Sequence, residues 1–262
     1  MMPLHLDRIV ANTFIQQVRF HESIESTNTD ALQFCKSQPC DTPLLVIAEE
    51  QTAGRGRGSN QWWSSGGALT FSVVLDPTDF SISEQQWPKA SLTTGVAICA
   101  ALELFAAEHQ VALKWPNDVF LNGRKVCGVL VEVAQQRPNA KLVIGIGINV
   151  NNSFADAPEE LRQIATSLID TTSLENDLTD VLTAVLLQLE QQFTRLGQDE
   201  SLADEWQRRC YLDGRSVELE TGQRMVAGTC QGIDDEGALV LATDGGVERF
   251  FGGVVVGIGG NG

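Results

Sequence analysis

Positive charge is scarce in this chain of 262 residues. It has 18 lysine and arginine residues against 34 aspartate and glutamate residues, which gives a formal net charge of −16 at pH 7. Binding to nucleic acid or to an anionic membrane surface depends on clustered positive charge. The composition therefore argues against both functions, and we expect neither nucleic acid nor a membrane among the partners.

Patterns of secretion, membrane insertion and disulfide cross-linking are also missing. The six cysteines form no CxxC pair and are too sparse for a disulfide scaffold, so we interpret them as reduced residues. Residues 1–20 lack the continuous apolar stretch of a signal peptide. No apolar run reaches the ~18 residues that a membrane span requires. These absences predict a cytoplasmic protein.

Several common catalytic and nucleotide-binding patterns are absent as well. The three histidines are scattered without metal-ligand spacing, so we expect no tightly bound metal. The glycine-rich loop from Gly54 to Gly58 lacks the Gly-Lys-Ser/Thr ending of a Walker motif. The Gly145-Ile146-Gly147 segment lacks the third glycine of a Rossmann fingerprint.

The patterns that are present predict an α+β fold. Continuous apolar runs predict strands of a sheet that is covered on at least one face; they are residues 44–48, 69–75, 111–115, 126–133 and 142–150. Asn122-Gly123 predicts a hairpin, because both residues accept the positive φ angles of a type I′ turn. Three helices are predicted to pack on this sheet, at 88–108 with Pro88 in the first turn, at 158–169 and at 178–196.

The last fifty residues have a different texture. Short strand-like runs are separated by turn signals about every 8 to 12 residues, which indicates a small all-β barrel or sandwich. The runs are residues 216–219, 225–233, 238–241 and 247–251. We therefore predict two closely joined domains, 1–209 and 210–262.

Two basic segments predict a site for a small anion. In the loop that follows Gln51, glycines would let the backbone approach a phosphate, while Arg55 and Arg57 would supply charge-assisted hydrogen bonds of ~1.5 to 3 kcal/mol each. A simple surface turn is the alternative interpretation of this loop. Lys114 follows an apolar run, where an ammonium group is costly to bury without an anionic partner. The residues after it, Trp115 to Asp118, would by themselves form a type I turn with proline at its second position.

The segment that starts at Ser26 predicts a helix N-terminus. Thr27 and Asp30 approximate a capping box, so a cap without further function is one interpretation. The other is that the hydroxyl, amide and backbone N–H groups of Ser26, Thr27 and Asn28 also bind a polar ligand.

Together these segments resemble the biotin protein ligase family, also called biotin-[acetyl-CoA-carboxylase] ligases. They occur in the family's order over about half of the chain, and the combination is more specific than any single motif. The matching residues are 26–28, Gln51, 53–57, Trp62, 114–118, 125–132 and 145–149.

The resemblance implies a mixed sheet flanked by helices, related to class II aminoacyl-tRNA synthetases, followed by an SH3-like barrel. It also implies a two-step reaction. Biotin and ATP with Mg²⁺, all as substrates, first give biotinyl-5′-AMP and pyrophosphate; a lysine of a biotin carboxyl carrier protein then takes the biotinyl group.

The resemblance further implies roles for individual residues. Lys114 and Arg57 are the expected catalytic residues. The expected biotin-binding residues are Ser26, Thr27, Asn28, Gln51, Gly54, Arg55, Gly56, Arg57, Lys114 and Gly128. The expected ATP-binding residues are Arg55, Arg57, Trp62, Lys114, Asn117 and Asn149.

The chain departs from the family pattern at two places. Many members have a third arginine after Arg57, where this chain has Gly58-Ser59-Asn60, so its triphosphate contacts must come from elsewhere, with Asn60 and Lys125 as candidates. Only about 25 residues precede Ser26, which is too few for the DNA-binding domain of the members that are repressors. We therefore expect a ligase without a regulatory domain.

Alternatives and partners follow from the same residues. A lipoate or octanoate ligase shares the fold, but an Arg-Arg and Gly-Gly-Gly loop would be expected there. A non-catalytic binding or regulatory protein is less compatible with Lys114 and both arginines. Carrier docking is expected to use local shape or edge-strand pairing, and exposed strand edges would permit a sheet-extending homodimer.

Overall fold

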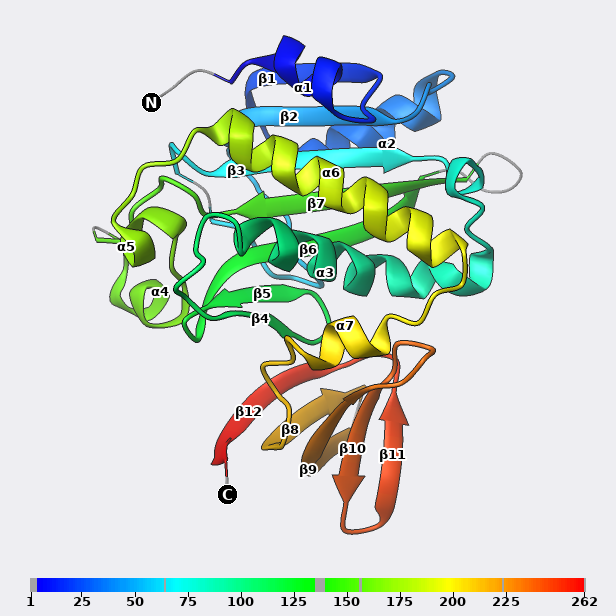
Figure 1. The fold of residues 1–262 in the computed structure, drawn as a ribbon, viewed down its shortest axis with the longest axis vertical. Helices are drawn as coiled ribbons and strands as arrows, with labels where there is room; N and C mark the ends of the chain where they lie inside the picture. Colours follow the sequence, from blue (N-terminus) through cyan, green and yellow to red (C-terminus); the bar gives the residue numbers. More distant parts are fainter. Residues whose placement is uncertain (1–3, 64, 135–139, 156, 223, 262) are drawn as a thin grey trace.

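The computed structural model describes residues 4–63, 65–134, 140–155, 157–222 and 224–261, and they form two sheets with helices around the larger one (Figure 1). The larger sheet has seven strands in the order β1-β2-β3-β7-β6-β5-β4. They are β1 Gln17–Ile24, β2 Leu44–Gln51, β3 Leu69–Leu75, β4 Val111–Lys114, β5 Asp118–Leu121, β6 Arg124–Ala134 and β7 Lys141–Ile148. The β1–β2 pair is parallel and all other neighbours are antiparallel. This mixed sheet confirms the predicted α+β class.

Both faces of this sheet are covered. Helices α3 (Ala90–Leu102) and α6 (Leu178–Gly197) lie side by side over one face, and α2 (Thr27–Ser37) lies on the other (Figure 1). Side chains of a strand alternate between faces, and β2 follows this rule. Leu45 and Ile47 pack in the core with α3 and α6, whereas Leu44 and Val46 pack with α2. The continuous apolar runs thus belong to strands buried on two sides.

The predicted helix 178–196 is confirmed by α6, whereas the other two helix predictions need correction. Pro88 belongs to a preceding 3₁₀ helix, Glu84–Lys89, and α3 already ends at Leu102. The chain turns there and leaves the side chain of Leu104 69% exposed. The apolar residues beyond Leu102 therefore do not continue the helix.

The predicted helix 158–169 is interrupted in the middle. The structure has α4 (Glu159–Ile164) and α5 (Leu168–Thr172) instead. Between them, Thr166 donates its N–H to the carbonyl of Lys125 at 2.9 Å, which ties the segment to β6. The Ser167 side chain then caps α5. A tertiary hydrogen bond therefore breaks the helix that the sequence pattern favours.

Both predicted turns flank β5, but only Asn122-Gly123 has the predicted conformation. Asn122 and Gly123 have φ angles of 48° and 80° and connect β5 to β6 as an antiparallel hairpin. The residues from Trp115 to Asn117 connect β4 to β5, so Lys114 and the following strand are antiparallel neighbours as predicted. The Trp115–Pro116 peptide bond is cis, which differs from the turn that the sequence predicts.

Some elements carry no clear signal in the sequence. These are α1 (Leu6–Asn12), β1, the short helix α7 (Ala203–Gln207) and the last strand, β12 (Val254–Asn261). In β1 the side chains are exposed or half-buried, so the apolar pattern is weak. In β12 glycines interrupt the apolar residues. None of the helices in the described part of the chain is both long enough and apolar enough to cross a membrane.

The C-terminal residues form the predicted all-β unit. Its antiparallel sheet has the order β11-β10-β9-β8-β12. The strands other than β12 are β8 Arg215–Thr221, β9 Arg224–Ile233, β10 Leu239–Thr243 and β11 Gly246–Phe250. Figure 1 shows this sheet below the larger one, with α7 between them.

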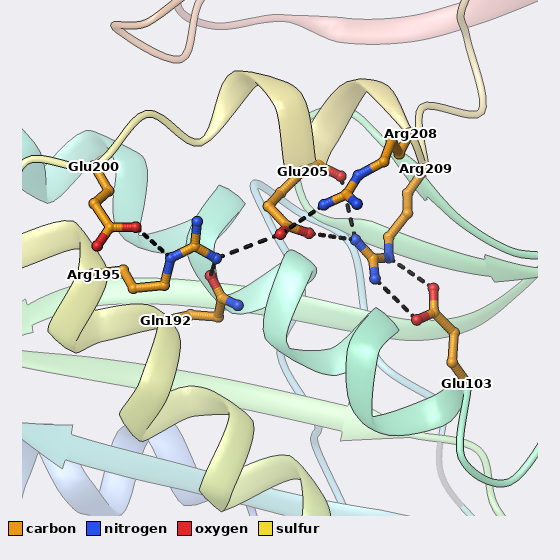
Figure 2. Close-up of polar contacts among 7 residues, drawn as sticks. All are labelled: Glu103, Gln192, Arg195, Glu200, Glu205, Arg208 and Arg209. Carbon is orange, nitrogen blue, oxygen red and sulfur yellow. Dashed lines mark hydrogen bonds and ion pairs between the residues drawn. The ribbon is translucent and has the colours of Figure 1, made fainter.

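The junction between the two units is held by backbone pairing and by a charged network. Leu113 of β4 donates its N–H to the Arg209 carbonyl at 2.7 Å and accepts the Tyr211 N–H at 2.8 Å. The Arg209 guanidinium binds both carboxylate oxygens of Glu103, at 2.7 and 2.9 Å, and also Glu205 of α7 at 2.7 Å (Figure 2). The segment at the predicted domain boundary is therefore anchored to the edge of the first sheet, next to Lys114.

Candidate active site

A cavity of about 500 Å³ lies where the first sheet meets the second. Its walls come from the N-terminus of α2, the loop after β2, the β4–β5 turn, the middle of β6 and β7, and the second sheet. Most of the predicted site residues line it: Ser26, Thr27, Asn28, Gln51, Arg55, Gly56, Arg57, Trp62, Lys114, Asn117 and Gly128. Residues far apart in the sequence thus converge on one space.

One end of the cavity is a hydrogen-bonded polar group at the start of α2. The Gln51 side-chain oxygen accepts the Thr27 N–H at 2.7 Å and lies 3.2 Å from the Thr27 hydroxyl. Ser26 is the helix cap, and its side chain accepts the Thr29 N–H. The prediction of Thr27 as the cap was therefore one residue late, and Asp30 makes no capping box because its carboxylate binds Arg19 and His21 instead.

Asn28 is fixed by two residues to which the sequence analysis gave no role. Its side-chain nitrogen donates to Glu132 at 2.9 Å, and its oxygen accepts from the Ser72 hydroxyl at 2.6 Å. Ser72 is a polar residue within the mostly apolar run of β3, and Glu132 ends the motif 125–132. Their polarity inside buried strands was the signal that could have identified them.

The glycine-arginine loop forms a narrow hairpin. The backbones of Arg55 and Gln61 form an antiparallel β-bridge. Gly56 donates its N–H to the Asn60 carbonyl at 2.8 Å, and Trp62 donates its N–H to the Gly54 carbonyl at 2.9 Å. A Cβ on Gly54 would lie 2.7 Å from the Trp62 carbonyl oxygen. Gly54 is therefore needed for the close approach of the two hairpin strands, rather than as part of the cavity wall.

Glycines of β6 and β7 make room for the Trp62 ring. Gly128 and Gly147 are paired neighbours, and both line the cavity. A Cβ on Gly147 would lie 2.3 Å from the indole, and one on Gly128 would lie 3.3 Å from it. Trp62 thus packs directly on the strand backbone and forms an apolar part of the cavity wall, which suits a planar ligand group.

The two arginines of the loop have different partners. Arg55 forms a bidentate pair with Glu132, with both N–O distances at 2.9 Å. Arg57 instead donates to the Gly253 carbonyl at 2.9 Å, just before β12. Glu220, Gly222 and residues 253–255 of the second sheet also line the cavity. Arg57 therefore connects the loop to the C-terminal unit across the site.

Lys114 is the last residue of β4 and is half-buried in the cavity wall. Burial lowers the pKa of its ammonium group; Asp118 opposes this shift and Lys125 adds to it. Asp118 is already paired with Lys125 at 2.6 Å, and within the described ranges Lys114 has no ion-pair partner. The geometry therefore leaves a cation in the site whose charge an anionic ligand would stabilise.

The two predicted asparagines differ in position. Asn117 donates to the Val129 carbonyl at 2.7 Å and holds the β4–β5 turn against β6. Asn149 does not belong to the cavity lining. It is 2% exposed, and its amide donates to Thr166 and accepts from Asn152. The structure therefore brings Asn117 to the cavity but places Asn149 behind it.

Sequence comparison defines the class to which this fold and cavity belong. Residues 20–149 match a model of the Biotin/lipoate A/B protein ligase family, and residues 214–256 match the Biotin protein ligase C terminal domain. The bifunctional ligase/repressor BirA of Bacillus subtilis is 33% identical over 240 residues, which cover 90% of this chain and 72% of that protein. The biotin--[acetyl-CoA-carboxylase] ligase of Paracoccus denitrificans is 32% identical over 245 residues, which cover 87% of this chain and 98% of that protein.

The solved structures agree with this classification. The biotin protein ligase from Aquifex aeolicus in complex with biotin and ATP superposes with a TM-score of 0.77 at 29% sequence identity, covering 91% of this chain and 97% of that chain. The chain belongs to the biotin protein ligase family.

Proposed function

We propose that this protein is an ATP-dependent biotin protein ligase that forms biotinyl-5′-AMP from biotin and MgATP and then transfers the biotinyl group to a lysine of a carrier protein. The observation that carries the proposal is a single cavity in which the polar group of Thr27 and Gln51 lies together with the half-buried Lys114. Such a cavity can hold a ligand with a polar head and an anionic tail. The Aquifex aeolicus relative, which has the same fold, is described in complex with biotin and ATP.

The polar end suits the ureido ring of biotin, which offers two N–H donors and a carbonyl acceptor. Because the Gln51 oxygen already accepts from Thr27, the N–H groups of its amide are the ones that remain for a ligand acceptor. The hydroxyls of Ser26 and Thr27 can accept from ligand donors. The apolar side chains of Val129 and Ile146, which also line the cavity, suit the thioether ring and the alkyl chain.

The cationic end suits the first chemical step. A carboxylate oxygen of biotin attacks the α-phosphorus of ATP, and pyrophosphate leaves. Two anions must approach each other, so the step requires fixed positive charge at the reacting atoms. Lys114 supplies this charge, and its partial burial strengthens the interaction. We assign Arg57, which lies at the contact with the second sheet, to binding the phosphate groups.

The second step proceeds on the same cavity wall. The amine of the acceptor lysine attacks the acyl carbon of the mixed anhydride, and AMP leaves. Until then the anhydride must be shielded from water. The Arg57–Gly253 contact supports this function, because it draws the loop and the second sheet together over the site. Mg²⁺ is proposed to enter with ATP as part of the substrate; the cytoplasmic location and the homodimer stay predictions.

Pyrophosphate release with MgATP and one of three acids tests the proposal. We expect release with biotin and little with lipoate or octanoate, followed by transfer to a carrier domain. The family model over residues 20–149 includes both biotin and lipoate ligases, so lipoate is the informative competitor. Release with lipoate alone would contradict the assignment and would make the protein a lipoate ligase.

A further inference from the structure

Glu132 joins two different walls of the cavity through contacts of both its carboxylate oxygens. It lies on β6, with its side chain 25% exposed. Its carboxylate accepts two hydrogen bonds from Arg55 of the hairpin loop, at 2.9 Å each, and one from the Asn28 amide of α2, also at 2.9 Å. A loop and a helix that are distant in sequence thus share one anchor.

These contacts determine the orientation of the Asn28 amide. A carboxylate can only accept hydrogen bonds, so it requires the nitrogen of Asn28 to face it. The carbonyl of Leu130 accepts from the same nitrogen at 3.3 Å, and the Ser72 hydroxyl lies 2.6 Å from the amide oxygen. A flipped amide would place its oxygen against the carboxylate and the Leu130 carbonyl, which gives two repulsive acceptor–acceptor contacts. Asn28 is 3% exposed, so water cannot relieve such a mismatch.

The same contacts occupy the charge of Arg55. A bidentate arginine–carboxylate pair has fixed geometry and uses two of the guanidinium's donors in parallel. A phosphate approaching Arg55 would have to compete with Glu132 for these donors. Arg57 and Lys114 have no carboxylate partner among the residues that the structure describes, so they do not face this competition.

We propose that Glu132 is a positioning residue that holds the Arg55 loop and the Asn28 amide in one arrangement, and thereby shapes the biotin-binding half of the cavity. In this assignment Arg55 acts through Glu132 on the shape of the site, and the cations that meet the phosphates are Lys114 and Arg57. The proposal rests on the proposed function, because biotin and ATP are the ligands whose binding it separates. It also revises the expectation that Arg55 binds ATP.

The two roles of Arg55 make opposite predictions for Glu132→Gln. Glutamine keeps the size of the side chain but loses the ion pair, and its amide can donate to a flipped Asn28. If Glu132 is a positioning residue, the KM for biotin rises by about tenfold or more, as for loss of a charge-assisted hydrogen bond, while the KM for ATP changes little. If Arg55 is instead a phosphate-binding cation, its release from Glu132 leaves the biotin KM unchanged and lowers the KM for ATP.

Steady-state pyrophosphate release measures both KM values for wild type, Glu132→Gln, Arg55→Ala and the double variant. We expect Arg55→Ala to raise the KM for biotin. In the double variant the KM for biotin should rise by less than the product of the two single-variant factors, because the two residues act through one contact. Equal rises in the KM for biotin and the KM for ATP would overturn the proposal. Independent effects of the two substitutions on the KM for biotin would also overturn it. Glu248→Gln is the matched control, because it removes an arginine–glutamate pair with Arg224 outside the cavity.

Folding and function are separated in the same experiment. Thermal unfolding of each variant shows whether a change in KM reflects a damaged fold. Glu132→Asp has a shorter side chain but keeps the carboxylate, so it should preserve the orientation of the Asn28 amide. Its KM for biotin should therefore rise less than that of Glu132→Gln. A larger rise with Glu132→Asp would contradict the role of the carboxylate. If the wild type releases no pyrophosphate with biotin, the proposed function fails; if it does and the biotin KM of Glu132→Gln is unchanged, only this inference fails.

Discussion

The two ends of the cavity differ in how their polar groups are satisfied. At the α2 end, Thr27, Asn28, Gln51, Ser72 and Glu132 bind one another, and all of them belong to the first unit. At the other end Lys114 has no ion pair in the described part of the chain, and Arg57 reaches a backbone carbonyl of the second unit. One end is preorganised for a neutral polar group, whereas the other has cations whose best partner is a ligand.

This difference suggests that the two substrates meet different kinds of surface. A ureido ring needs donors and acceptors at fixed positions, which a closed hydrogen-bond network provides. Phosphate and carboxylate groups need charge, which is most effective when it is not already neutralised by a carboxylate of the protein. The following changes would alter one end and leave the other intact, and they are given from the largest expected effect to the smallest.

Lys114→Ala should remove the main cation at the reacting centre. We expect biotinyl-5′-AMP formation to fall by about 10² to 10³, the cost of losing one key charge-stabilising group. The variant should stay folded, because Lys114 makes no ion pair within the described ranges and its burial opposes its charged form. Single-turnover adenylate formation measures the effect, with Lys36→Ala, an exposed lysine of α2, as control. Turnover like that of the wild type would contradict the mechanism.

Gly147→Ala should displace the Trp62 ring. The added Cβ would lie 2.3 Å from the indole, so the ring must move by more than a few tenths of an ångström. Misplacement of a site group by ~1 Å can cost about 10²-fold, so we expect a loss of activity between about tenfold and a hundredfold. Tryptophan fluorescence and adenylate formation check this. Gly245→Ala is the control, since its nearest neighbour lies 3.7 Å away; an equal loss there would show a general effect on stability.

Arg57→Ala should weaken the contact between the loop and the second sheet. The hydrogen bond to Gly253 joins a charged donor to a carbonyl, but it is solvent-exposed. We therefore expect a change of about tenfold or less in the KM for ATP and in the lifetime of bound biotinyl-5′-AMP. The biotin KM should change least. Rapid filtration measures how fast bound biotinyl-5′-AMP is released from the wild type and from the variant. Identical lifetimes of the bound adenylate would argue against a contact that closes the site.

The pH dependence of biotin binding should report on Lys114. Burial lowers its pKa below the ordinary value of 10.5, so the unfolded state binds more protons between the folded and unfolded pKa values, and the ligand-free protein gains stability as pH rises through that window. Biotin binding should show the opposite trend, because its carboxylate favours the ammonium form. We expect affinity to decrease as pH rises toward 10, by at most tenfold per pH unit. Calorimetric titration measures it; Lys114→Arg, which stays charged, should lack this decrease.

Local patterns predicted much of the fold, and they failed where distant segments decide the structure. The Asn122-Gly123 hairpin and helix α6 follow from residues close in sequence, and both are present. The helix predicted at 158–169 is broken by a hydrogen bond from Thr166 to Lys125, which no local pattern contains. Strand β12 was not predicted, because its glycines interrupt the apolar pattern of a strand. Its strand conformation depends on pairing with β8.

The sequence predicted which segments contribute to the site better than it predicted the contacts between their side chains. The resemblance identified the loop, the α2 start and Lys114, and the cavity contains all three. It gave no role to Ser72 or to Glu132, whose partners are contributed by other segments. It assigned both Arg55 and Arg57 to ligand binding, although in the structure one binds a carboxylate and the other a carbonyl next to the second sheet. Asn149 was predicted for the nucleotide and lies behind the cavity wall.

By itself the sequence determined which groups the protein can use: the basic glycine loop, the capped helix start and a lysine at the end of an apolar strand in an acidic chain. These depend on local backbone preferences and on the cost of burying charge, which are properties of neighbouring residues. The tertiary structure alone decided which charge is neutralised and which stays available for a ligand. That outcome depends on which segments the fold brings together: Glu132 of β6 pairs with Arg55 of the loop, and no carboxylate pairs with Lys114 among the residues described.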